Sequence, residues 1–64
     1  MQYVIKEYYS HSGEFIGDTW RLSSMEAVSL AREAAQNSNV KSEVWKVFYD
    51  TEGELKEILK YSSE

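Results

Sequence analysis

The chain has 64 residues, with seven basic and eleven acidic side chains, a formal net charge of −4 and no cysteine. A chain of this length forms at most one small domain, which buries only about 60% of its unfolded surface and is marginally stable alone. The absence of cysteine excludes disulfides, thiolate catalysis and cysteine-ligated zinc, and the acidic balance argues against a domain whose whole surface binds nucleic acid.

No apolar run approaches the roughly 20 residues of a membrane span. The first residues, MQYVIK, lack the basic start and long apolar stretch of a signal peptide. We therefore expect a single domain over residues 1–64 that works in the cytoplasm and has no membrane partner.

The first two predicted elements are strands joined by a tight turn. Residues 3–9 are rich in β-branched and aromatic side chains, and residues 14–21 return as the second strand. The turn over residues 10–13 is typical of a three-residue hairpin loop with Gly13 in the left-handed conformation. Gly17 interrupts the second strand, which indicates that another element, such as a helix, packs closely there.

The central predicted element is a helix over residues 23–38, the only long segment with a clean helical period. Ser23 and Glu26 have the spacing of a capping box at its start. At 100° per residue, one side carries the apolar residues, Ala27, Val28, Leu30, Ala31, Ala34 and Ala35. Because four of these six are alanines, the bulk of the core has to come from a sheet beneath the helix.

Two further strands are predicted, over residues 40–49 and 54–61, with Gly53 in a second turn. Residues 54–60 also have a helical pattern, and we prefer a strand because this hairpin resembles the first one. Residues 4–15 aligned with residues 44–55 match at several positions, either through duplication or because both hairpins obey the same turn rules.

The predicted fold is therefore α+β, ββαββ, with a four-stranded antiparallel sheet in the order 2-1-3-4 and one helix on one face. The first and third strands are the most apolar and suit the centre of the sheet. The second and fourth strands carry more polar residues and suit its edges.

The hairpin turns also predict which side chains share a face, because a shift of one residue exchanges the faces. We expect Tyr9 opposite Phe15, Ile5 opposite Thr19, Tyr3 opposite Arg21, Tyr49 opposite Leu55, Trp45 opposite Leu59 and Glu43 opposite Tyr61. Odd-numbered residues form the larger apolar set and are assigned to the helix side: Tyr3, Ile5, Tyr9, Phe15, Trp45, Val47, Tyr49, Leu55, Leu59 and Tyr61.

The even-numbered residues then form a second surface that one helix cannot cover. Its members, our predicted interaction face, are Val4, Lys6, Tyr8, Ile16, Trp20, Val44, Lys46, Phe48, Lys56 and Ile58. Exposed apolar patches of this size usually mark an interaction site. We expect a protein-interaction module that binds a second copy of itself or acts as an adaptor or inhibitor, with Tyr8, Trp20 and Phe48 as anchors.

Two alternatives remain open. The same aromatic residues beside lysines, including Lys60, could bind single-stranded nucleic acid by stacking, although the signature of RNA-recognition modules is absent. Alternatively, lysine stems shield the aromatic rings and the domain has no docking face.

The sequence predicts no enzymatic activity and no catalytic, cofactor-binding or metal-binding residue. His11 is the only histidine and lies in a predicted turn, and no G-x-S-x-G motif or glycine-rich phosphate loop occurs. The acids at residues 50–54 lack the spacing of a calcium-binding loop.

Overall fold

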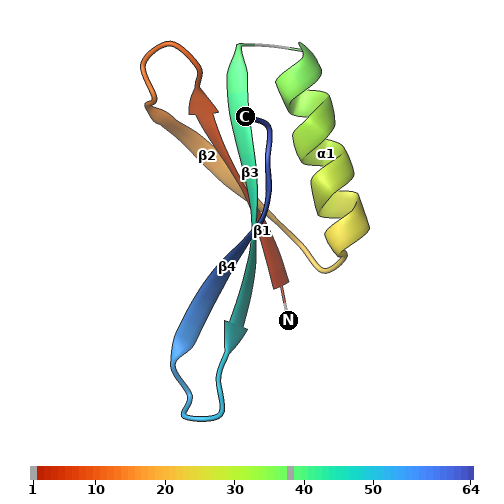
Figure 1. Cartoon of the computed structure of the whole chain (residues 1–64). Helices are drawn as coiled ribbons and strands as arrows, with labels where there is room; N and C mark the ends of the chain where they lie inside the picture. Colours follow the sequence, from red (N-terminus) through yellow and green to blue (C-terminus); the bar gives the residue numbers. More distant parts are fainter. Residues whose placement is uncertain (1, 38) are drawn as a thin grey trace.

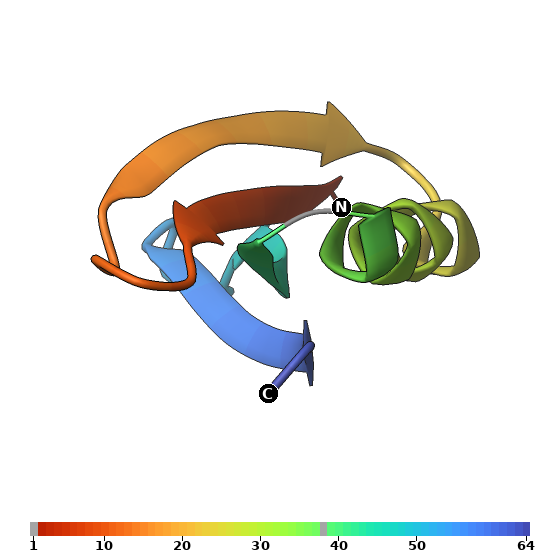
Figure 2. The same ribbon diagram turned by 90° about the horizontal axis from the view of Figure 1, so that it is seen from above.

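The computed structural model describes residues 2–37 and 39–64. Its elements in chain order are β1 (Gln2–Tyr9), β2 (Phe15–Arg21), α1 (Ser24–Asn37), β3 (Val40–Tyr49) and β4 (Leu55–Ser62). The strands form one antiparallel sheet in the order β2-β1-β3-β4, and α1 lies against one side of it (Figures 1 and 2). This confirms the predicted ββαββ fold and strand order, and the last segment is a strand.

The start of α1 follows the predicted cap in part. The Glu26 amide donates to Ser23 Oγ at 3.3 Å and the Ala27 amide donates to the Ser23 carbonyl at 3.0 Å. The Glu26 carboxylate lies 3.1 Å from Arg21 Nε, so it joins the helix to the end of β2. The helix ends at Asn37; Ser38, which the prediction included, lies outside the described residues.

The two hairpin loops differ by one residue. In the second loop, the Gly53 amide donates to the Asp50 carbonyl at 3.0 Å, which matches the predicted turn. In the first loop, the Gly13 amide donates to the Tyr9 carbonyl at 2.8 Å, so four residues separate Tyr9 from Glu14. Both glycines have positive φ, 75° and 81°, but the first loop is one residue longer than predicted.

A bulge in each hairpin changes the pairing locally. Because of the longer first loop, Phe15 lies opposite Tyr8 rather than Tyr9, and the extra residue Ile16 restores the predicted pairs farther along β1. In the second hairpin, the pairs near the turn are as predicted, but Lys60 is an extra residue and Tyr61 therefore lies opposite Val44 instead of Glu43.

Gly17 lies next to the β2 bulge, and the helix does not pack closely on it. A Cβ atom built on Gly17 would meet no atom within 4 Å, so the predicted packing of the helix on this residue was wrong. Glycine in a strand also accompanies bulges, and Gly17 directly follows the extra residue Ile16.

The pairing of the two central strands contradicts the predicted faces. Ile5 lies opposite Val44, and Val4 lies opposite Trp45. Odd-numbered residues of β1 therefore share a side with even-numbered residues of β3. The prediction that odd-numbered residues of all strands lie together was wrong, because no turn connects β1 to β3 and the hairpin rules could not set their register.

The core lies between α1 and the central strands and is built from small side chains. Ile5, Val44, Ala27 and Ala31 are buried together, with four partly buried neighbours: Tyr3, Val28, Leu30 and Tyr61. The guanidinium of Arg32 lies 5.7 Å from the ring centroid of Tyr61. The alanine-rich side of the helix thus packs on the sheet as predicted.

The sequence resemblance between the hairpins does not extend to the sides on which the residues lie. Val44 lies under α1, whereas the aligned residue Val4 lies on the opposite side of the sheet. The resemblance is therefore better explained by shared strand and turn rules than by a preserved duplication.

The molecule is longer than it is wide because the β3–β4 hairpin extends past α1 (Figure 1). Its principal extents are 39 × 23 × 17 Å and its radius of gyration is 12.1 Å. A compact chain of this length has a radius of gyration of roughly 11 Å. Part of the sheet is consequently not covered by the helix on either side.

Candidate interaction surface

The side of the sheet away from α1, which we call the open face, carries an apolar row across all four strands. Trp20 of β2 pairs with Val4 of β1, Val4 pairs with Trp45 of β3, and Trp45 pairs with Leu59 of β4. Val4 is only 1% exposed although α1 lies on the other side. Cross-strand neighbours bury one another in this way, so the two indoles shelter Val4 while Trp20 and Leu59 remain 47% and 46% exposed.

Further apolar side chains lie on either side of this row. Tyr8 and Phe15 are opposite each other, with ring centroids 5.7 Å apart in an edge-on arrangement. Val47 follows Trp45 on the same side and is buried, and Tyr49 and Leu55 pair near the β3–β4 turn and are exposed. We define the open-face apolar set as Val4, Phe15, Trp20, Trp45, Val47, Tyr49, Leu55 and Leu59.

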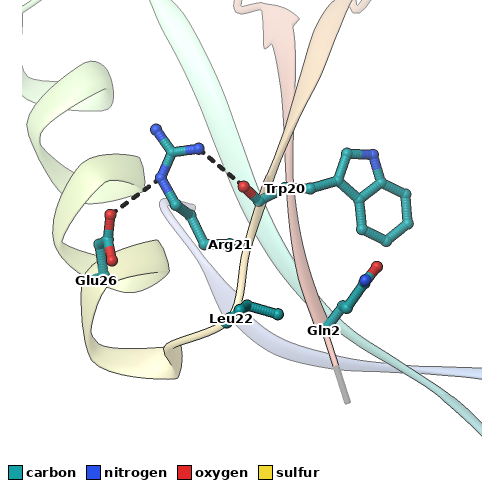
Figure 3. A pocket seen from close by; sticks show the side chains of 5 residues that line it. All are labelled: Gln2, Trp20, Arg21, Leu22 and Glu26. Carbon is teal, nitrogen blue, oxygen red and sulfur yellow. Dashed lines mark hydrogen bonds and ion pairs between the residues drawn. The ribbon is translucent and has the colours of Figure 1, made fainter.

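Trp20 forms the wall between two hollows. One, of about 380 Å³, is lined by Trp20, Val47 and Tyr49 together with Gln2 and Leu55. The other, of about 350 Å³, lies next to the start of α1 (Figure 3). Figure 3 shows the indole of Trp20 turned away from the helix, whereas the next residue, Arg21, reaches toward Glu26.

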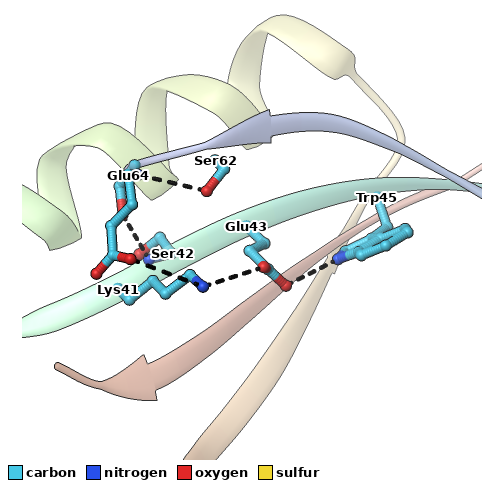
Figure 4. A network of polar contacts seen from close by, with 7 residues as sticks. Lys41, Ser42, Glu43, Trp45, Ser62 and Glu64 are labelled. Atoms are coloured by element: carbon cyan, nitrogen blue, oxygen red, sulfur yellow. Dashed lines mark hydrogen bonds and ion pairs between the residues drawn. The ribbon is translucent and has the colours of Figure 1, made fainter. Parts of the chain in front are cut away.

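Lys6 and Lys41 on the open face are ion-paired within the chain. Lys6 Nζ lies 5.2 Å from the ring centroid of Trp45 and 3.7 Å from Glu57 Oε1. The lysine therefore crosses above the indole from β1 to β4. On the neighbouring row, Glu43 accepts a hydrogen bond from Trp45 Nε1 at 3.1 Å and lies 3.7 Å from Lys41 Nζ (Figure 4).

Tyr8 belongs to the same polar cluster. Desolvation raises the pKa of its phenol above the ordinary value of 10.0, and the neighbouring carboxylates of Glu43 and Glu57 raise this pKa further. The phenol also hydrogen-bonds to Glu43. The protonated form of Tyr8 is thus favoured in the folded protein.

The structure divides the predicted interaction face between both sides of the sheet. Val4, Lys6, Tyr8 and Trp20 lie together on the open face. Val44 is fully buried under α1, and Ile16 lies at the bulge of β2. The four remaining members share the side of Val44 toward the β3–β4 turn: Lys46, Phe48, Lys56 and Ile58.

Six of the eight members of the open-face apolar set had been assigned to the helix side. One of them, Phe15 of β2, lies on the open face because the first loop is one residue longer than predicted. The other five, which belong to β3 and β4, are Trp45, Val47, Tyr49, Leu55 and Leu59. Within either strand nothing distinguishes the two sides, since both β3 and β4 are apolar at odd and even positions. Only the pairing of β1 with β3 identifies these residues.

Other kinds of site are not indicated within residues 2–37 and 39–64. No group of three or more histidine, cysteine, aspartate or glutamate side chains is placed to hold a metal ion there. Among the described residues, no helix has the length and apolar character needed to cross a membrane. His11 lies exposed in the β1–β2 loop.

Comparison of the chain with protein-family models, with curated proteins and with solved structures found no match.

Proposed function

We propose that this protein is a non-enzymatic protein-interaction module that binds its partner through the open face. The observation that carries the proposal is the apolar row from Trp20 to Leu59, which spans every strand of the sheet and has no helix over it. Such a row resembles the inner face of a two-layer sheet packing, in which a second layer covers it.

The size of the patch supports this proposal over a surface that simply faces water. The exposed parts of the open-face apolar set amount to on the order of 500 Å², taking about 200 Å² for a fully exposed aromatic side chain. The largest apolar patch on a typical monomer is about 300–600 Å² and is often functional. Lys6 partly covers the ring of Trp45. Among the described residues, no lysine ammonium lies over the ring of Trp20 in the same way.

The charge distribution favours a protein partner over single-stranded nucleic acid. Nucleic-acid platforms combine stacking rings with a positively charged groove. On the open face, Lys6 and Lys41 are ion-paired with carboxylates, whereas Lys46 and Lys56 belong to the other side of the sheet. The rings therefore lie beside neutralised charges.

The proposal is tested with two kinds of probe and one pair of variants. Mixed-sequence oligonucleotides are added at low salt while tryptophan fluorescence is recorded, and a random-peptide phage library is selected on the immobilised protein. We expect no quenching by oligonucleotides and enrichment of peptides that bind the open face. Trp20→Ser should weaken peptide binding at least tenfold, since truncation of a central aromatic anchor costs about 2 kcal/mol or more.

Met25→Ser serves as the matched control, because Met25 is 84% exposed at the start of α1. The selected peptides should bind this variant as they bind the unchanged chain. Peptides that bind Trp20→Ser equally well would place docking elsewhere. Saturable quenching by oligonucleotides would favour the nucleic-acid alternative.

A further inference from the structure

We infer that the partner of the open face is a second copy of this chain, packed open face to open face about a two-fold axis; this inference rests on the proposed function. A two-fold interface uses the same patch on both subunits, so that patch must be complementary to itself. The charge, the shape and the area of the open face are all compatible with such self-complementary packing.

The charge of the open face permits close approach of two copies. At paired strand positions, its charged residues are two lysines and three acids, Lys6 and Lys41 with Asp18, Glu43 and Glu57. Two of the acids are within 4 Å of these lysines, Glu57 at 3.7 Å from Lys6 and Glu43 at 3.7 Å from Lys41. The face is therefore close to neutral although the chain carries −4, and it lacks the excess charge that would select a strongly acidic or basic partner.

The shape of the open face includes both projecting side chains and a recess. Trp20 and Leu59 project from β2 and β4, each nearly half exposed. Next to Trp20 lies the hollow of about 380 Å³ over Val47. Two copies related by a two-fold axis can each insert an apolar side chain into the recess of the other.

The area of the open-face apolar set fits a dimer of modest affinity. Two copies would bury on the order of 1,000 Å² from this set alone, which is about the smallest area of a specific interface. The side chains that surround the set would add to that area.

The small core explains why a second copy would stabilise the fold. Among the described residues, six apolar side chains are buried, and two of them, Val4 and Val47, lie on the open face. Chains below about 70–80 residues often depend on oligomerisation, disulfides or a metal for stability. A second sheet packed on Val4 and Val47 would make them the centre of a second core layer.

The chain provides a matched pair of substitutions for the test. Leu59 and Ile58 are consecutive in β4, are 46% and 44% exposed, and point to opposite sides of the sheet. Sedimentation equilibrium of the full chain from 5 µM to 1 mM should show a monomer–dimer equilibrium. Leu59→Lys should raise the dissociation constant at least 30-fold, because it places a lysine from each copy in the interface, and Ile58→Lys should change it less than threefold.

Three outcomes would overturn the inference: a monomer at 1 mM, equal effects of the two substitutions, or a larger effect of Ile58→Lys. Monomeric protein that still binds the selected peptides at Trp20 would retain the proposed function and reject the second copy as partner. Monomeric protein that selects no peptides would reject both.

A second measurement uses the unchanged chain, in case a variant does not fold. Both tryptophans lie on the open face, so dimer formation should shift their emission to shorter wavelength over the concentration range of the sedimentation transition. Emission that stays constant while the mass doubles would place the interface elsewhere on the molecule and overturn the inference.

Discussion

At the residue scale, Ser42 shows how a polar group can be buried without gaining a hydrogen bond. The residue is fully buried on the helix side of β3, and its backbone is joined to Ser63 by two hydrogen bonds of 2.9 Å. Its hydroxyl has no hydrogen-bond partner in the described part of the chain. Such a hydroxyl loses its hydration on folding and gains no bond in exchange.

Ser42→Ala should therefore leave the free energy of unfolding unchanged or raise it by up to about 1 kcal/mol. Urea denaturation followed by circular dichroism measures this quantity. Val44→Ala, at the neighbouring core position, is the control and should lower it by about 2 kcal/mol through the cavity that it leaves. A loss of about 1 kcal/mol or more in Ser42→Ala would mean that the hydroxyl makes a stabilising hydrogen bond.

The phenol of Tyr8 should make stability depend on pH in the alkaline range. Its pKa in the folded protein is raised above the unfolded value of 10.0 by desolvation and by Glu43 and Glu57. The unfolded chain therefore loses this proton at a lower pH than the folded chain does. The contribution of this phenol to the free energy of unfolding is fully present below pH 10. It is lost as the pH rises through the higher pKa of Tyr8 in the folded protein.

Urea denaturation at pH 8 and at several pH values above 10 tests this expectation with the variant Tyr8→Phe. The wild type should be more stable than Tyr8→Phe at pH 8, and this difference should shrink as the pH rises. Tyr49→Phe, which removes a hydroxyl from a ring that is 72% exposed, controls for general effects of alkali. A difference that stays constant with pH would contradict the assignment.

At the scale of elements, the two hairpins depend on glycine for conformational reasons. Gly53 has a φ of 81°, and an added Cβ would meet no atom within 4 Å. Space is therefore available, and only the left-handed backbone disfavours a larger residue. Gly17 has equally open surroundings without the positive φ, so the two positions separate backbone strain from crowding.

Gly53→Ala should lower the free energy of unfolding by about 1–2 kcal/mol, the cost of the left-handed conformation for a residue with a Cβ. Gly17→Ala should be neutral or stabilising by up to about 1 kcal/mol, because it restricts the unfolded chain. Thermal or urea denaturation of both variants provides the comparison. Equal losses at both positions would mean that crowding and not φ determines the cost.

The elements could be predicted from sequence because each has a local cause. Ser23 caps the helix, the glycines close the turns, and β-branched and aromatic residues mark the strands. Which side chains share a face could be predicted only within a hairpin, and only where the loop length was predicted correctly. The first loop has one more residue than the turn rules suggested, and Ile16 compensates for it.

The candidate surface could be predicted only in part, for the same reason. Val4 of β1 and Trp20 of β2 were grouped correctly because a turn connects their strands. Phe15 of β2 was assigned to the wrong side, because the turn is one residue longer than predicted. The β3 members were not grouped correctly, because residues 10–39 separate the two central strands and their pairing follows from tertiary packing. The alanines of α1 fit over Val44, the smaller neighbour of Trp45, and this leaves the indole for the other side.

At the scale of the whole molecule, one helix and four strands make an unequal two-layer arrangement. Helix α1 covers Ile5 and Val44 with small side chains, while most of the large aromatic and aliphatic residues lie outside this core. The proposed dimer would place the open faces of two sheets against each other, giving a layer order of helix, sheet, sheet, helix. The bulk missing from the helix side would then be supplied between the sheets.

The bulges have a consequence for how far assembly can proceed. The extra residues, Ile16 and Lys60, both lie on the outermost strands, β2 and β4. Bulged edge strands pair poorly with another chain, because the spacing of their unpaired amides and carbonyls does not match that of a regular strand. Face-to-face packing of two open faces about a two-fold axis is complete with two molecules. Pairing between edge strands, in contrast, could add further molecules and form a fibre. The sequence thus discourages open-ended growth while leaving a closed pair available.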